Sequence, residues 1–186
     1  EGDRVILFIG KFEPKKDPAL LLQAFQQLRE EVRSPGKIKL LYVGNGALEQ
    51  ELRNGAAGME EVLFLPFQNQ SLMPVIYRLG SVVCLPSKGP GETWGLVINE
   101  ANACGVKCVI SDRAGCAADL GQVPGNRVFE SGDKDDLVRE LKGAVDGGGP
   151  AFAEAMAGGS GDRDYFLERW NYGKVVEAVK RVGGLV

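Results

Sequence analysis

The feature that most constrains the fold is a series of short apolar runs that alternate with segments of helical periodicity. Continuous apolar runs of this kind predict strands covered on both faces, as in a parallel sheet. Strand alternating with helix is typical of a doubly wound fold. The sequence therefore predicts an α/β fold with a mainly parallel, six-stranded Rossmann-like sheet and helices on both faces. The predicted strands occupy residues 5–9, 38–43, 62–65, 82–85, 108–110 and, more weakly, 127–129.

The segments between these runs supply the helices. Apolar residues from Leu20 to Leu28 recur at helical spacing, with charged residues on the other side of the predicted helix. Asp17 followed by Pro18 predicts an N-cap and a proline in the first turn. Further helices are predicted around residues 48–52, 72–79, 96–104 and 137–145.

The length of 186 residues suits a single domain with a full core. We expect a Rossmann-like core over residues 4–146, followed by a helical tail over residues 147–186, because a Gly-rich stretch at 147–150 interrupts the pattern. Within the tail, the longer of the predicted helical segments covers residues 165–182. An apolar run that begins almost at the first residue predicts that the chain is part of a longer protein.

Composition and charge exclude several classes of function. The net charge of −3 argues against a nucleic-acid-binding surface, which needs a basic excess or stripe. The chain has no histidine, which excludes a Ser-His or Cys-His nucleophile pair within it. No apolar run reaches membrane-spanning length.

The cysteine spacings match no common zinc pattern, so we expect no metal site. Buried free thiols are the expected state, which predicts a reducing compartment, either the cytoplasm or the cytosolic face of a membrane. The cysteines are Cys84, Cys104, Cys108 and Cys116.

The predicted topology directs attention to two loops. If the strand order is 3-2-1-4-5-6, the ligand crevice lies between strands one and four, beside loops 10–17 and 86–95. In the first loop, Gly10 permits a sharp turn, while Lys11, Lys15 and Lys16 either neutralise a diphosphate or simply solvate the loop. After strand two, the Gly-Asn-Gly sequence at 44–46 predicts a tight turn, with lining the floor under a nucleotide as a second role.

The loop after strand four is long, rich in Gly and Pro, and leads into an apolar helix. Unpaired backbone N–H groups at such a helix start attract anionic or hydroxylated groups. Glu92 precedes the helix, and Glu100 falls inside it, near the expected binding face. A carboxylate at that position is costly to bury unless it accepts hydrogen bonds, and the paired hydroxyls of a ribose would suit it. The alternative is an ordinary surface glutamate.

Residues 86–105 resemble the signature of the GT-B retaining glycosyltransferases of family 4, or group 1. Its mark is two glutamates, here Glu92 and Glu100, with seven residues between them, in a helix entry that continues into Glu-Ala and Cys-Gly. The similarity runs in consistent order over residues 4–146. The other matching segments are 10–12 with Lys16, 43–46, 111–112 with 115–116, and 132–133.

The resemblance, which is to the family's C-terminal, donor-binding domain, implies roles for individual residues. Lys11 stands where the family usually has arginine and Lys16 matches its lysine; both are expected to grip the donor diphosphate beside Gly10. Glu92 is expected near the transferred sugar and Glu100 on the ribose. The remaining donor-site residues are Thr93, Trp94, Gly95 and Leu96, whose segment holds sugar hydroxyls and phosphate, and Phe67, Gln68 and Leu72 beside the base.

Two positions depart from the family pattern. Lysine at position 11 keeps the charge of arginine but loses its bidentate geometry, so the phosphate contact is weaker or differently shaped. Trp94 is bulkier than the phenylalanine often found at that position, and this is expected to tune the sugar pocket.

The resemblance also implies partners. The substrate is expected to be a nucleoside-diphosphate sugar, bound without cofactor or metal because Lys11 and Lys16 stabilise the departing diphosphate. An acceptor-binding domain is expected to precede this chain, and the chain is expected to be inactive without it. Any peripheral membrane association is expected to occur through that domain. The alternatives are a non-catalytic nucleotide-binding module and a GT-B epimerase; no pyridoxal-lysine motif supports a phosphorylase.

Overall fold

The computed structural model describes residues 4–31, 38–89 and 94–146. The chain divides into two compact units, Glu1–Phe152 and Ala153–Val186, and all described residues belong to the first. The predicted helical tail at 147–186 lies outside the described residues, as do Glu92 and Thr93.

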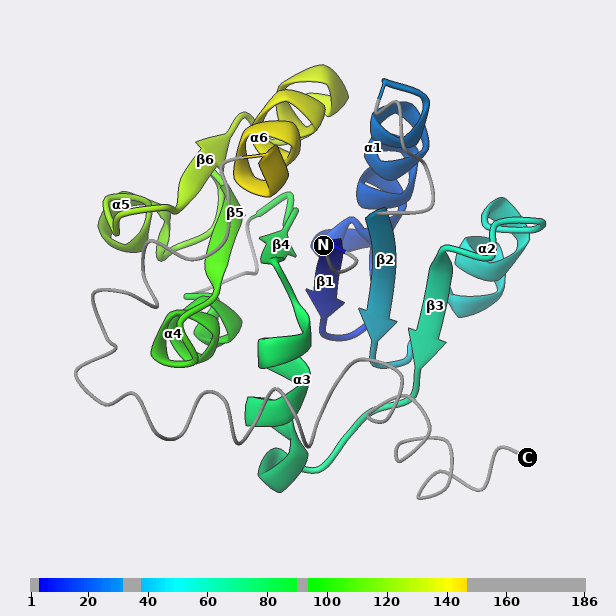
Figure 1. Cartoon of the computed structure of the whole chain (residues 1–186), viewed down its shortest axis with the longest axis horizontal. Helices are drawn as coiled ribbons and strands as arrows, with labels where there is room; N and C mark the ends of the chain where they lie inside the picture. Colours follow the sequence, from blue (N-terminus) through cyan, green and yellow to red (C-terminus); the bar gives the residue numbers. More distant parts are fainter. Residues whose placement is uncertain (1–3, 32–37, 90–93, 147–186) are drawn as a thin grey trace. The chain divides into compact units, whose positions relative to one another are not determined.

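The described part is built on one parallel sheet of six strands (Figure 1). Its strand order is β3-β2-β1-β4-β5-β6, which is the order assumed in the sequence analysis, and the order reverses between β1 and β4. In register, Ile6 of the central strand faces Leu40 on one side and Val82 on the other. The strands are β1 (Arg4–Ile9), β2 (Ile38–Val43), β3 (Val62–Leu65), β4 (Val82–Leu85), β5 (Lys107–Ser111) and β6 (Arg127–Phe129).

The helices follow the predicted segments, and the structure adds three short elements. The predicted helices correspond to α1 (Pro18–Glu31), α2 (Glu49–Gly55), α3 (Met73–Leu79), α4 (Leu96–Ala103) and α6 (Lys134–Asp146). The sequence analysis missed α5 (Ala117–Leu120) and the 3-10 turn η1 (Pro14–Lys16), because both are too short to produce a periodic pattern. A second 3-10 turn, η3 (Gln70–Leu72), leads into α3.

Asp17 differs from the predicted N-cap. Its backbone is left-handed, with φ of 46°, whereas an N-cap residue is normally extended. Asp17 closes the η1 turn, and its carboxylate lies 3.1 Å from the Lys88 ammonium. Pro18 does begin α1, as predicted.

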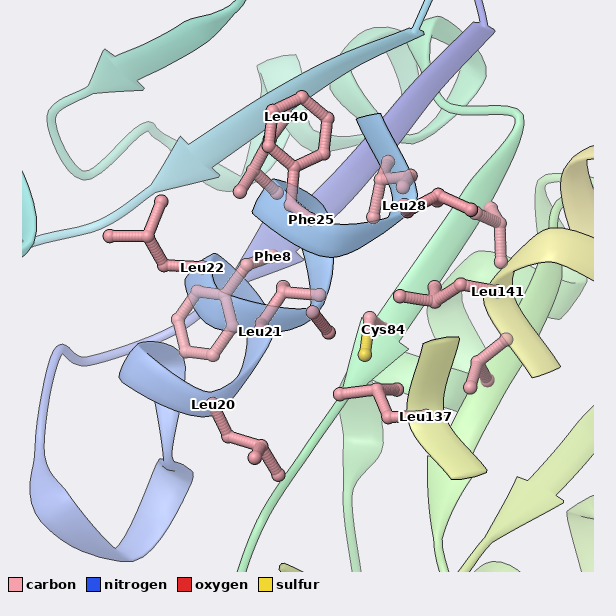
Figure 2. Close-up of a cluster of buried hydrophobic side chains, with 14 of the residues drawn as sticks. Phe8, Leu20, Leu21, Leu22, Phe25, Leu28, Leu40, Cys84, Leu137 and Leu141 are labelled. Carbon is pink, nitrogen blue, oxygen red and sulfur yellow. The ribbon is translucent and has the colours of Figure 1, made fainter. Parts of the chain in front are cut away.

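The sheet is buried on both faces, which explains why its strands are continuously apolar. Ile6 and Phe8 belong to a cluster with side chains of α1, α2 and α6, whereas their neighbours Val5 and Leu7 are equally buried on the opposite face. Figure 2 shows leucines of α1 and α6 meeting over β4 at Cys84. In Figure 1, α1 and α6 lie together on one side of the sheet, and α3 and α4 lie on the other.

One buried hydrogen bond ties the sheet to the start of α1. The Tyr42 hydroxyl of β2 donates to the Pro18 carbonyl oxygen at 2.8 Å, and Tyr42 is fully buried. Tyr42→Phe removes that donor and keeps the ring, so we expect the free energy of unfolding to fall by about 1 kcal/mol. Urea denaturation measures the change, and an unchanged midpoint would show that this bond contributes nothing.

Candidate functional site

The loops that follow β1 and β4 meet at the point where the strand order reverses. The Lys88 backbone N–H donates to the Lys15 carbonyl oxygen at 2.9 Å, and the Lys88 ammonium lies 3.1 Å from Asp17 Oδ2. The Asp17 side chain is only 8% exposed, so the carboxylate of this ion pair is sheltered from water. The structure therefore joins the two loops that the topology predicts as the sides of a ligand crevice.

The loop after β2 holds the loop after β1 from the other side. Phe12 donates its N–H to the Asn45 carbonyl at 2.8 Å, and its own carbonyl accepts the Leu48 N–H at 3.0 Å. A Cβ atom on Gly44 would lie 2.0 Å from the Gly10 carbonyl oxygen, and one on Gly46 would lie 2.5 Å from the Phe12 carbonyl oxygen. These two glycines therefore serve close packing of loop on loop as well as turning the chain.

An aromatic cluster anchors the first loop. The ring of Phe12 is fully buried and packs near Phe8, Tyr42 and Phe64, with ring centroids 5.8 to 6.4 Å apart. The residue before it, Lys11, points its side chain outward and is 75% exposed. The backbone that carries Lys11 is thus fixed by the core, while its ammonium group reaches solvent at the carboxyl end of the sheet.

The lysines of this loop pair weakly with acidic neighbours. Glu13 lies 3.9 Å from the Lys11 ammonium and 3.5 Å from the Lys15 ammonium. Exposed ion pairs of this kind contribute about 0–1 kcal/mol, so an anionic ligand can displace them readily. Lys16 ends the η1 turn and is partly buried.

The Glu100 carboxylate is held from a second helix. The Tyr77 hydroxyl of α3 donates to Glu100 Oε2 at 2.6 Å, and the Gln70 side-chain amide donates to Oε1 at 3.5 Å. The pKa of the Tyr77 phenol is raised far above its ordinary value. The main cause is burial of the side chain, and the second is its hydrogen bond to Glu100. Glu100 is half-buried, and its carboxylate is oriented by the buried Tyr77 phenol and, more weakly, by the exposed Gln70 amide.

Apolar side chains beside α4 are unusually exposed. Trp94 is 40% exposed and Leu96 is 68% exposed, and the Trp94 indole N–H donates to Asn99 Oδ1 at 2.7 Å. Between them, Gly95 has φ of 96° and packs so closely that a Cβ there would lie 2.7 Å from Leu85 Cδ2. Exposed aromatic and aliphatic groups at the end of a sheet are typical of a surface that a ligand or partner covers.

The predicted base-side residues follow β3. Phe67 is 76% exposed, Gln68 turns its amide back onto the Pro66 carbonyl at 2.8 Å, and Leu72 ends η3 beside Gln70. The η3 turn brings this segment next to Glu100 through the Gln70 amide. Phe67 and Gln68 have no described contact with Glu100, so their assignment to the site stays a prediction.

The sequence analysis missed four contributors, namely Gln70, Tyr77, Lys88 and Asn99. A signal existed for Tyr77, because a tyrosine on the apolar face of a predicted helix needs a hydrogen-bond partner for its hydroxyl. Lys88 and Asn99 lie in the loop and helix that the analysis identified, but their partners emerge only from the folded geometry.

The cysteines give no sign of reactivity. All four are free, and Cys84, Cys108 and Cys116 are buried. Burial raises the pKa of the Cys84 and Cys108 thiols well above the ordinary value, which keeps them protonated and unreactive. Among the described residues, no group of three or more Cys, Asp or Glu side chains could hold a metal ion, and no helix is long and apolar enough to span a membrane.

Comparison with known proteins gives a consistent family. The model described as "Glycosyl transferases group 1" matches residues 1–158. A phosphatidyl-myo-inositol mannosyltransferase of Mycolicibacterium smegmatis is 33% identical over 145 residues, covering 77% of this chain and 36% of the relative. A D-inositol 3-phosphate glycosyltransferase of Rhodococcus erythropolis is 32% identical over 123 residues, covering 61% of this chain and 27% of the relative. The chain thus spans about a quarter to a third of the length of these relatives.

Solved structures show the same fold at low identity. An α,α-trehalose-phosphate synthase (UDP-forming) from Burkholderia xenovorans superposes with a TM-score of 0.70 at 18% identity, over 83% of this chain and 38% of that one. The catalytic domain of a cholesterol-α-glucosyltransferase from Helicobacter pylori gives a TM-score of 0.65 at 18% identity, over 77% of this chain and 86% of that one.

Proposed function

Because this chain belongs to the group 1 glycosyl transferases, we propose that it is the donor-binding domain of a retaining enzyme that moves a hexose from a nucleoside-diphosphate sugar to an acceptor hydroxyl. The observation that carries the proposal is the Glu100 carboxylate, which two hydrogen bonds hold on α4, the helix that follows the loop at the carboxyl edge of β4. In doubly wound sheets that edge, at the reversal of strand order, is where nucleotides bind.

The donor diphosphate is proposed to lie against the loop after β1. Lys11 and Lys16 supply the positive charge, and the buried Phe12 fixes the backbone between them. Charge that builds on the departing diphosphate is stabilised by ammonium groups that are already in place, so little reorganisation is needed during transfer. Gly10 allows the chain to turn immediately after the strand.

The transferred sugar is proposed to sit at the start of α4. Glu92 faces the sugar in this proposal, and Thr93 with Trp94, Gly95 and Leu96 contributes backbone amides and an apolar wall. Support comes from the exposure of Trp94 and Leu96, which present apolar surface at this end of the sheet. Stacking of a sugar ring on an exposed indole would cover part of that surface.

The nucleoside is proposed to bind across α4 and the segment after β3. Glu100 accepts hydrogen bonds from the ribose hydroxyls, while Phe67, Gln68 and Leu72 lie beside the base. The exposed Phe67 ring offers a face on which a base can stack.

An acceptor-binding domain upstream completes the proposed enzyme, and this chain alone is inactive. The relatives are named for transfer to inositol phosphate and phosphatidyl-inositol acceptors, and this chain covers only 27% and 36% of two of them. Their remaining length leaves room for a second domain that holds the acceptor and any membrane contact. Four free cysteines support a reducing compartment, and the proposed location is the cytoplasm or the cytosolic face of a membrane.

Replacing Lys16 tests the diphosphate assignment. We expect Lys16→Ala to weaken binding of the nucleoside diphosphate by about tenfold or more, because one charge-assisted contact is lost. Lys142→Ala is the matched control, since Lys142 pairs with Glu31, on α1. Titration calorimetry of both variants measures the effect, and equal affinities for the two would remove Lys16 from the site.

A further inference from the structure

We propose that Tyr77 is a positioning residue that aims the Glu100 carboxylate at the ribose and thereby sets the preference of the site for ribonucleotides, with Gln70 as a weaker second support. This inference rests on the proposed function and adds to it two residues outside the glutamate motif. It is carried by the geometry between α3, η3 and α4.

The contact between Tyr77 and Glu100 is short and comes from a rigid source. The oxygen–oxygen distance of 2.6 Å is typical of a hydroxyl that donates to an ionised carboxylate. Tyr77 is only 1% exposed, so its ring is fixed by core packing and its hydroxyl has little freedom. Glu100, in contrast, has a flexible side chain that needs an external donor to hold one orientation.

The direction of the hydrogen bond is also fixed. A carboxylate can only accept, and the buried phenol keeps its proton because its pKa is raised. Tyr77 therefore acts as a permanent donor at Oε2 across the physiological pH range. The carboxylate is held in one orientation before any ligand arrives.

The two donors leave acceptor positions unused on both carboxylate oxygens of Glu100. An ionised carboxylate offers about four acceptor positions, two on each oxygen. Among the residues that the structure describes, Tyr77 uses one position on Oε2 and Gln70 uses one on Oε1. One remaining position on each oxygen matches a pair of adjacent hydroxyls, which a ribose has and a 2′-deoxyribose lacks.

The test is the ratio of affinities for ribo- and deoxyribonucleotides in the full protein. UDP, GDP and ADP are each titrated beside their 2′-deoxy counterparts, and the tightest pair is used for all variants. We expect the native protein to prefer the ribonucleotide by about tenfold or more, as expected for one hydrogen bond to a charged group. Tyr77→Phe keeps the ring and should reduce this ratio to about threefold or less.

Tyr42→Phe is the matched control, because it also removes one hydroxyl from a buried tyrosine but leaves Glu100 untouched. A loss of stability alone would weaken both nucleotides equally and leave the ratio unchanged, so the ratio isolates positioning. Circular dichroism establishes that each variant is folded before titration.

Each outcome has a defined meaning. A ratio lowered in Tyr77→Phe and in Glu100→Gln, but kept in Tyr42→Phe, supports the inference. A ratio lowered in Glu100→Gln but kept in Tyr77→Phe overturns the role of Tyr77 and leaves the proposed function standing. If the native protein binds none of these nucleotides, the proposed function fails, and the inference fails with it.

Discussion

Gly44→Ala is expected to destabilise the protein by about 3 kcal/mol or more, or to prevent folding altogether. The backbone φ of 143° at Gly44 is one that side-chain-bearing residues rarely adopt. In addition, the new Cβ would lie 2.0 Å from the carbonyl oxygen of Gly10, which is backbone and cannot swing aside. Because Gly44 and Gly10 lie in the loops after adjacent strands, relief of the clash requires the loop after β1 to move away.

Gly58→Ala provides the control for this prediction. Gly58 also has a positive φ, of 79°, but nothing lies within 4 Å of the added Cβ. We expect a cost of about 1 kcal/mol from the backbone conformation alone. Urea denaturation of both variants separates the steric contribution from the conformational one, and equal losses of stability would refute the loop-on-loop packing argued for Gly44.

Glu100→Ala is expected to weaken nucleoside-diphosphate binding by about tenfold to a hundredfold. The substitution removes a charged acceptor, and hydrogen bonds to charged groups contribute about 1.5–3 kcal/mol each. Stability is also expected to fall, by about 1–3 kcal/mol, because the substitution leaves the hydroxyl of the buried Tyr77 without its acceptor. Nucleotide affinity is therefore measured on protein that circular dichroism shows to be folded.

The control for Glu100→Ala is Glu49→Ala. Glu49 is a glutamate of α2 whose carboxylate pairs with Arg53 one turn later. Its loss should leave nucleotide affinity unchanged. If both glutamate variants bind nucleotide as tightly as the native protein, then Glu100 has no part in the donor site.

The fold could be predicted because its signals are local and strong. Residues 38–43, 62–65 and 82–85 are apolar enough to define β2, β3 and β4 to the residue, since strands buried on both faces admit few polar side chains. The alternation of strand and helix predicts a doubly wound parallel sheet, whereas the strand order was only assumed in the sequence analysis and is given by the structure. The short helix α5 was missed because four residues cannot show helical periodicity.

The site was predictable only where a motif marks it. Glu100 stands out in the sequence, but its partner Tyr77 is 23 positions away on another helix. The contact exists because α3 and α4 pack on the same face of the sheet, and no sequence spacing encodes that distance. The ion pair between Lys88 and Asp17 arises in the same way, from two loops brought together at the switch in strand order.

The most direct test of the central claim is calorimetric titration of the full protein with UDP, GDP and ADP. The donor-domain account predicts saturable binding of one of these nucleotides at one site per chain, weakened in Glu100→Ala and unchanged in Glu49→Ala. Absence of binding by all three, in protein shown to be folded, would contradict it.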